Sequence, residues 1–258
     1  MPNPSSKSAP VAGTNASGAR TARAPVIRVN SHRSVKPYNP GLYELVEGKR
    51  HWDHPLTEAE RDRGFLGWNQ RGYLPHYDAP GAVQFVTFRL HDSFPASLRS
   101  EWEALLAVED RREQRAKLEE YLDKGRGEAL LRRPELARIV AEALQHFDGE
   151  RYQLLAWVVM PNHVHVLLHQ TATPLGETIG GWKSYTAKEA NRLLGRSGTF
   201  WQEDYWDTFM RDEEQEAKAR SYIANNPVKA RLVRTPAEWP WSGARAAGPL
   251  TPPEGERT

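Results

Sequence analysis

Two histidines separated by one residue are the first feature of this sequence that suggests chemistry. His163 and His165 stand in "WVVMPNHVHVLLHQ", residues 157–170, where most neighbours are apolar. Side chains alternate between faces along a strand, so both imidazoles point the same way with Cβ atoms about 6 to 7 Å apart, while Val164 points into the opposite face. Two imidazoles at that spacing can bind one metal ion. An ion with only two protein ligands keeps open positions, which suits catalysis.

The histidine pair also has an ordinary interpretation. His-x-His occurs often by chance, and on a half-exposed strand it needs no metal. The sequence has no cysteine, which excludes disulfides, thiolate catalysis and cysteine-based zinc sites. Any metal must therefore be bound by His, Asp, Glu or Asn. No further His, Asp or Glu stands at convincing spacing, since His169 lies about 13 Å beyond His165 on the same strand face.

A second candidate is the pair Tyr222 and Asn226 in "ARSYIANNPVKARLV", residues 219–233. Residues four apart on a helix share a face, so the expected helix brings these two side chains together. The ordinary alternatives are a core tyrosine and an Asn-Pro sequence that only ends the helix. A phenol with a pKa near about 10 is a poor nucleophile at neutral pH, so a nucleophilic Tyr222 needs activation, for which a bound metal is the one candidate.

The elements that must position these residues follow from hydrophobic periodicity. Residues 83–90 and the hairpin 152–160 and 163–169 have strand composition, and Pro161-Asn162 is a turn pair. We predict helices at 134–147, 179–194 and 212–225, and a short strand within 199–210. The resulting order predicts an α+β fold of the ferredoxin-like split βαβ type, an antiparallel sheet with helices on one face.

Charge is distributed unevenly along the 258 residues. Residues 1–43 carry six basic side chains and no acid, so with a total of +2 the remainder carries 2 − 6 = −4. We expect a disordered basic tail at 1–43, which is either a solvated leader or an arm that follows phosphates. A single domain is expected at 44–245 with a helical insertion near 97–147, followed by a disordered tail at 246–258.

The sequence has no apolar run near the ~18 residues of a membrane helix and no apolar segment of a secretory signal. We therefore expect a cytoplasmic protein with no membrane partner.

Taken together, the motifs resemble those of the REP-associated tyrosine transposases, a branch of the single-tyrosine HUH transposases. The resemblance rests on "MPNHVH" followed some 60 residues later by "YIANNPVKA", with "RGYLPHYD", "FWQEDYWD" and "EWPWS" around them, and covers roughly residues 72–241. The basic leader and the charged helical stretch near 98–133 depart from a minimal member of that family.

The resemblance implies a metal-dependent single-stranded DNA endonuclease and strand transferase. His163 and His165 would bind Mg²⁺ or Mn²⁺, with Asn226 as third ligand, and Tyr222 would attack DNA to give a 5′-phosphotyrosine and a free 3′-OH. The implied partner is single-stranded or hairpin DNA of repetitive extragenic palindromes with a nearby tetranucleotide guide, and the implied state is a monomer. Two alternatives stay open: a DNA-hairpin binding protein without chemistry, and a metal hydrolase of a small substrate that uses the histidines alone.

DNA contacts are expected from two groups of side chains. A basic stripe on the helix of "GWKSYTAKEANRLLGR" is suited to a phosphate backbone, although such stripes are more often solvated faces. Its members are Lys183, Lys188, Arg192 and Arg196. Aromatic rings further along are suited to stacking on unpaired bases, with burial in the core as the alternative. These rings are Trp201, Tyr205 and Trp206.

Overall fold

The structure, a computed structural model, describes residues 55–70, 75–93, 113, 117, 120–122 and 124–245. The predicted tails at 1–43 and 246–258 lie outside the described residues. The part of the predicted insertion before residue 120 also lies mostly outside them. Within the described part of the chain, no helix is both long enough and apolar enough to span a bilayer.

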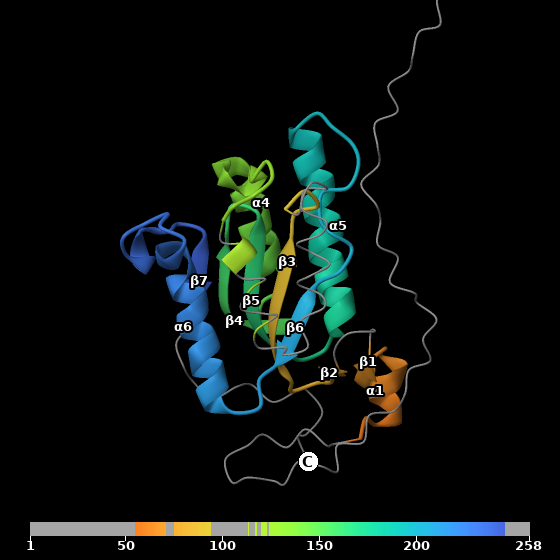
Figure 1. Ribbon diagram of the computed structural model, residues 1–258. Coiled ribbons are helices and arrows are strands. Elements are labelled where there is room, and N and C mark those ends of the chain that lie inside the picture. The colour runs from red at the N-terminus through yellow and green to blue at the C-terminus, as the bar shows by residue number, and fades with distance from the viewer. Residues whose placement is uncertain are drawn as a thin grey trace, which may run out of the picture.

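The centre of the molecule is a five-stranded antiparallel sheet with the order β6-β3-β5-β4-β7 (Figure 1). Its strands are β3 Val83–Arg89, β4 Tyr152–Val159, β5 His163–Gln170, β6 Trp206–Phe209 and β7 Ser242–Ala244. β3, the first of these in the chain, lies between β5 and β6, while β4 and β5 form the predicted hairpin. This is the split βαβ arrangement that the order of elements predicted.

Helices cover both faces of this sheet. α4 Pro134–Gln145 and α5 Leu175–Leu193 pack on one face, and α6 Glu213–Lys229 lies on the opposite face (Figure 1), so the prediction that helices cover one face holds for α4 and α5 but not for α6. Val164 and Val166 of β5 face α4 and α5, whereas Leu167 faces α6. Because both faces are covered, β5 is buried along its whole length, including its three histidines.

A small N-terminal unit packs at one end of the sheet. It consists of helix α1 Glu58–Asp62 and the antiparallel pair β1 Gly67–Gln70 and β2 Pro75–Asp78. The buried carboxylate of Asp78 accepts hydrogen bonds from Gln170 Nε2 at 2.7 Å and from the backbone N–H of Leu175 at 3.1 Å. This carboxylate therefore fastens the small unit to the end of β5 and to the first turn of α5. Two short 3₁₀ turns, η2 Leu130–Arg132 and η3 Pro236–Glu238, complete the described elements.

The helix that carries Tyr222 is longer than predicted. Asp212 caps its N-terminus by accepting from the backbone N–H of Gln215 at 2.7 Å, and the helix continues through Pro227 to Lys229. The prediction that this helix ends at Asn225 is wrong. A proline removes only its own donor, and close to the C-terminus the next turn still closes, with the N–H of Ala230 bonded to the Asn226 carbonyl at 2.9 Å.

Candidate metal and tyrosine site

The histidine pair lies at the start of β5, on the face covered by α6. His163 and His165 are both completely buried, and their Nε2 atoms are 3.1 Å apart. Metal–imidazole bonds of about 2.0–2.1 Å at angles of about 90–109° place two ligand nitrogens roughly 2.8 to 3.4 Å apart. The observed separation is a hydrogen-bond distance and also fits two neighbouring ligands of one ion, and the expectation that both rings point the same way is confirmed.

The other ring nitrogen of each histidine is bound by a polar side chain. His163 Nδ1 lies 2.8 Å from Asn162 Oδ1, and because an amide oxygen only accepts, Nδ1 donates and Nε2 keeps its lone pair. The Asn162 amide is itself held by its bond from Nδ2 to the Arg126 carbonyl at 3.1 Å. His165 Nδ1 lies 2.8 Å from Thr87 Oγ1 of β3. Hydrogen bonds of this kind orient the rings of metal-binding histidines.

Burial and neighbouring charge keep the first histidine neutral. Burial, together with the positive charges of Lys229 and Arg89, lowers the pKa of His163 to about 3. A histidine must be deprotonated to bind a metal, so His163 is in the required state at neutral pH.

Tyr222 projects from α6 onto the same face. Its ring centroid lies 5.3 Å from that of His165 in an edge-to-face arrangement, and 5.9 Å from that of Phe85. The side chain is half-buried, and its packing against the α6-side core includes the strand residue Phe85. The tyrosine and the histidines thus come together within one chain.

Asn226, one turn beyond Tyr222, is completely buried, and neither Oδ1 nor Nδ2 has a hydrogen-bond partner. Burying an amide group without hydrogen bonds costs free energy, so a ligand that binds the amide of Asn226 would relieve this cost. Among the described residues, no Asp or Glu joins the histidine pair in a cluster of three or more such side chains. The carbonyl oxygen of Asn226 is therefore available for the role of third ligand that the resemblance implies.

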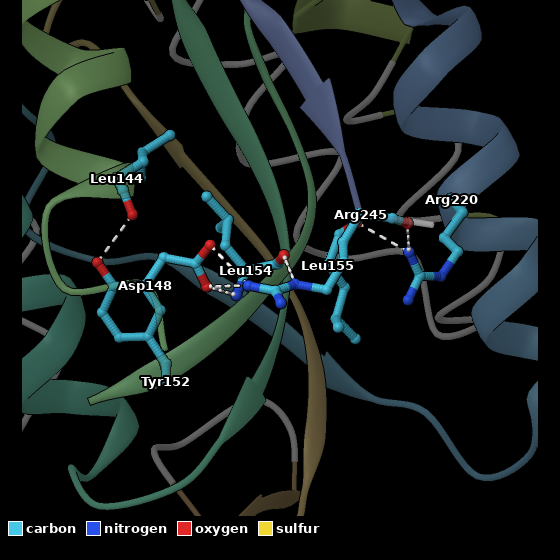
Figure 2. A network of polar contacts seen from close by, with 7 residues as sticks. All are labelled: Leu144, Asp148, Tyr152, Leu154, Leu155, Arg220 and Arg245. Carbon is cyan, nitrogen blue, oxygen red and sulfur yellow. Dashed lines mark hydrogen bonds and ion pairs between the residues drawn. The ribbon is translucent and has the colours of Figure 1, made fainter. Parts of the chain in front are cut away.

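A bulge in β4 determines how α6 is held on the sheet. The pairing of β4 with β5 shifts between Leu154 and Ala156, so Leu155 is an extra residue on β4. Its carbonyl accepts from Arg220 Nη1 at 2.8 Å and from the backbone N–H of Arg245 at 2.9 Å. Arg220 also donates to the Arg245 carbonyl at 3.1 Å, which Figure 2 shows beside the bulge. Arg220 thus fastens α6 two residues before Tyr222.

The same network continues to the other face of the sheet. The Arg245 guanidinium pairs with the Asp148 carboxylate at 2.9 Å, and Asp148 accepts from the N–H of Leu154 at 2.7 Å (Figure 2). Tyr152 of β4 donates its hydroxyl to the Leu144 carbonyl of α4 at 2.8 Å. Helices on opposite faces are thereby tied to one strand.

The aromatic residues predicted to stack on DNA occupy different environments. Trp201 and Tyr205 are only 4% and 8% exposed and belong to the core between the sheet and α5, so the stacking predicted for them is wrong in this structure. Trp201 Nε1 donates to Thr186 Oγ1 at 2.8 Å, which satisfies its one polar group. Trp206 is half-buried on β6 and pairs in register with Thr87, so it lies on the face that carries His165.

The predicted basic stripe is not a single row. On a helix of about 100° per residue, Lys183 stands about 140° around α5 from Lys188, and its ammonium donates to the Glu203 carbonyl at 2.5 Å. Burial lowers the pKa of Lys183 to about 8. Arg192 pairs with Glu189 at 2.8 Å and Arg196 lies beyond the helix end. The stripe lies on the helix that covers the face opposite the histidine pair.

Three polar neighbours of the histidines were not assigned a role from the sequence. The sequence predicts Asn162 only as a turn residue, and Thr87 and Arg89 only as part of the strand at 83–90. Arg89 is 7% exposed and pairs in register with His163. Alternation along β3 places Thr87 and Arg89 on one face, but the sequence contains no sign of which strand lies beside β5.

Comparisons with known proteins cover the region that carries the site. The family model "Transposase IS200 like" matches residues 128–226. A curated REP-associated tyrosine transposase from Haemophilus influenzae is 26% identical over 102 residues, which are 35% of this chain and 58% of that protein. The chain therefore spans little more than half the length of this curated relative.

Two solved structures are similar to part of this chain. One is a REP-associated tyrosine transposase bound to a REP hairpin, with 18% identity, a TM-score of 0.42, and coverage of 65% of this chain and 79% of that one. The other is a transposase from Deinococcus radiodurans, with 16% identity, a TM-score of 0.29, and coverage of 61% of this chain and 95% of that one. The segment that matches the family model contains His163, His165 and Tyr222 and ends at Asn226. The sequence comparisons confirm the resemblance of this chain to the REP-associated tyrosine transposases.

Proposed function

We propose that this protein is a metal-dependent single-stranded DNA endonuclease and strand transferase that acts on REP-type hairpins through a 5′-phosphotyrosine at Tyr222. One observation carries the proposal: the Tyr222 ring stands 5.3 Å from the ring of His165, on the face where the two histidines present their Nε2 atoms 3.1 Å apart. A phenol, two imidazoles and a buried amide in one place are suited to an attack on a phosphodiester.

In the proposed reaction the Tyr222 hydroxyl oxygen attacks the scissile phosphorus. The new bond joins the phenol oxygen to the 5′-phosphate, the bond from phosphorus to the 3′-oxygen breaks, and the phenol proton balances the 3′-hydroxyl that is released. No water is consumed, so the energy of the phosphodiester is kept for rejoining. His163, His165 and Asn226 would hold a divalent ion, which when bound would supply Lewis-acid polarisation of the phosphate.

The donor set bears on the identity of the metal and on the oligomeric state. Two imidazoles and one amide oxygen are softer than the all-oxygen sets that Mg²⁺ favours, so Mn²⁺ suits the site at least as well. Tyr222 reaches the histidines of its own chain, so the proposed active enzyme is a monomer.

The proposal is tested by trapping the covalent intermediate. Hairpin oligonucleotides with randomised single-stranded flanks and a 3′ label are incubated with protein and Mn²⁺, and labelled protein is sought on denaturing gels. We expect an adduct whose trapped strand, once sequenced, identifies the target and the polarity of cleavage. Tyr222→Phe abolishes the adduct and leaves hairpin binding nearly unchanged. Tyr185→Phe, which alters a 56% exposed tyrosine on α5, is the matched control and retains the adduct.

The same experiment distinguishes the alternatives. A hairpin-binding protein without chemistry gives a gel shift but no adduct from any sequence. An adduct that persists in Tyr222→Phe refutes the role of Tyr222, and activity of the His163→Ala/His165→Ala variant in excess chelator refutes the metal. A metal hydrolase of small substrates is less well supported, because among the described residues no carboxylate joins the histidines as a general base.

A further inference from the structure

Two cationic side chains of the described residues lie around the histidine pair. Lys229 and Arg89 both lower the pKa of His163 through their positive charge. The described part of the chain supplies no Asp or Glu that completes a three-residue cluster with the histidines. Sites that bind divalent ions usually contain carboxylates that offset the charge of the ion. This site instead places fixed positive charge where a cation is to bind.

Arg89 approaches from the sheet. It is the last residue of β3, it is 7% exposed, and it stands directly opposite His163 in the antiparallel register, as Thr87 stands opposite His165. Directly paired residues project from the same face with Cβ atoms about 4.5 to 5.5 Å apart. Burial of a guanidinium is costly, so its retention beside the histidines indicates a use for its charge.

Lys229 approaches from the helix. It follows Tyr222 by seven residues and Asn226 by three, which places all three side chains on one face of α6. Its ammonium lies 5.4 Å from the centroid of the Tyr222 ring, and its backbone is in the last helical residue before the cap. The side chain is exposed, so its charge is accessible from solvent.

We propose that Arg89 and Lys229 bind the non-bridging oxygens of the scissile phosphate from two sides of the histidine pair. The inference rests on the proposed function and adds to it the residues that hold the reacting phosphodiester. Guanidinium and ammonium groups are the side chains suited to phosphate oxygens, and the ring of Tyr222 lies beside Lys229, where the attacking oxygen and the phosphorus must meet.

This arrangement has a consequence for the two ligands. Arg89 and Lys229 attract a phosphodiester but repel a divalent ion, so removing either charge must weaken one ligand and strengthen the other. A residue with a merely structural role would weaken both. The proposed contacts are therefore indicated by a weaker affinity for the phosphodiester together with a stronger affinity for the divalent ion.

The test uses Arg89→Gln and Lys229→Gln in the full-length chain with the Tyr222→Phe background, so that no cleavage occurs. Mn²⁺ affinity is measured by electron paramagnetic resonance without DNA, and affinity for a single-stranded oligonucleotide is measured by fluorescence anisotropy in chelator over a series of salt concentrations. We expect Mn²⁺ to bind about fivefold tighter in each variant. We expect the oligonucleotide to bind more weakly, with a salt slope smaller by about 0.7 for one lost phosphate contact.

Lys218→Gln is the matched control. Lys218 is exposed on α6 and lies 11 residues, or about 16 Å, before Lys229 on the same side of the helix. We expect the loss of the Lys218 charge to leave Mn²⁺ affinity unchanged. Arg89→Lys keeps the charge and retains most of both affinities. Unchanged or weaker Mn²⁺ binding in Arg89→Gln and Lys229→Gln, or an unchanged salt slope, overturns the proposal. Failure of the parent protein to bind Mn²⁺ at all overturns the metal site of the proposed function instead.

Discussion

Replacing Arg220 by methionine tests whether the bulge in β4 positions the tyrosine helix. The guanidinium donates to the Leu155 carbonyl at 2.8 Å and to the Arg245 carbonyl at 3.1 Å, and it pairs with Glu216 at 2.8 Å. The Arg220 and Glu216 side chains are only 18% and 12% exposed. Methionine preserves much of the apolar stem and removes the charge.

The loss of stability follows from the groups left behind. Hydrogen bonds to charged groups contribute about 1.5–3 kcal/mol each, and breaking a buried ion pair costs about 3–5 kcal/mol, less where water reaches the pair. The Leu155 carbonyl keeps its bond from the N–H of Arg245, so it is not left unsatisfied. We expect Arg220→Met to lower the free energy of unfolding by about 2–4 kcal/mol, mainly through the loss of the ion pair with Glu216.

Urea unfolding measures this change, and the covalent-adduct assay, at a temperature where the variant is folded, measures its effect on Tyr222. We expect adduct formation to fall in Arg220→Met. The double variant Arg220→Met/Glu216→Met is expected to be more stable than Arg220→Met, because it also removes the largely buried carboxylate that has lost its ion pair with Arg220. Lys218→Met, which breaks an exposed pair with Glu214, is expected to change stability by less than about 1 kcal/mol. A loss below about 1 kcal/mol in Arg220→Met, or full adduct formation by it, refutes the reasoning.

Two further predictions concern the histidine pair. Thr87→Val keeps the shape of the side chain but removes the hydroxyl that lies 2.8 Å from His165 Nδ1. We expect the Mn²⁺ affinity, measured by titration calorimetry, to fall about 10- to 100-fold. An unchanged affinity would contradict the role of Thr87 in orienting His165. His163 has a pKa of about 3 in the folded chain against 6.5 when unperturbed. At pH values between these two, the unfolded chain binds a proton on His163 that the folded chain does not bind. His163 therefore lowers the free energy of unfolding by up to about 1.4 kcal/mol for each pH unit below 6.5, and it adds no pH dependence of stability above 6.5. Urea unfolding at several pH values should give a steeper loss in the parent protein than in His163→Gln, and equal slopes would show that His163 is not held neutral.

Local periodicity explains which parts of the fold were predictable. A period of two placed His163 and His165 on one face of a strand, and the burial of Val164 toward α4 and α5 confirms the opposite face. The strand order and the two crossover helices followed from the sequence of elements. The side of the sheet chosen by α6 was not predictable, because the helix has few apolar residues and is held by Arg220 at a bulge that no sequence pattern marks.

Polar partners across strands were beyond the reach of sequence patterns. Thr87 and Arg89 acquire their places beside the histidines from the pairing of β3 with β5, which joins residues more than 70 positions apart. The aromatic residues near β6 illustrate the same limit. Trp206 lies on the face of the histidine pair because it pairs with Thr87, whereas Trp201 and Tyr205 enter the core.

The continuation of α6 through Pro227 gives the helix its functional geometry. A helix that ended at Asn225 would leave Asn226 and Lys229 in a loop with no defined relation to Tyr222. Because the helix extends to Lys229, the three side chains follow each other at intervals of four and three residues along one face. One rigid element therefore carries the nucleophile, the proposed third metal ligand and the proposed phosphate contact. A displacement of α6 on the sheet must then move all three together relative to His163, so variants that loosen the helix should impair metal binding and cleavage in parallel.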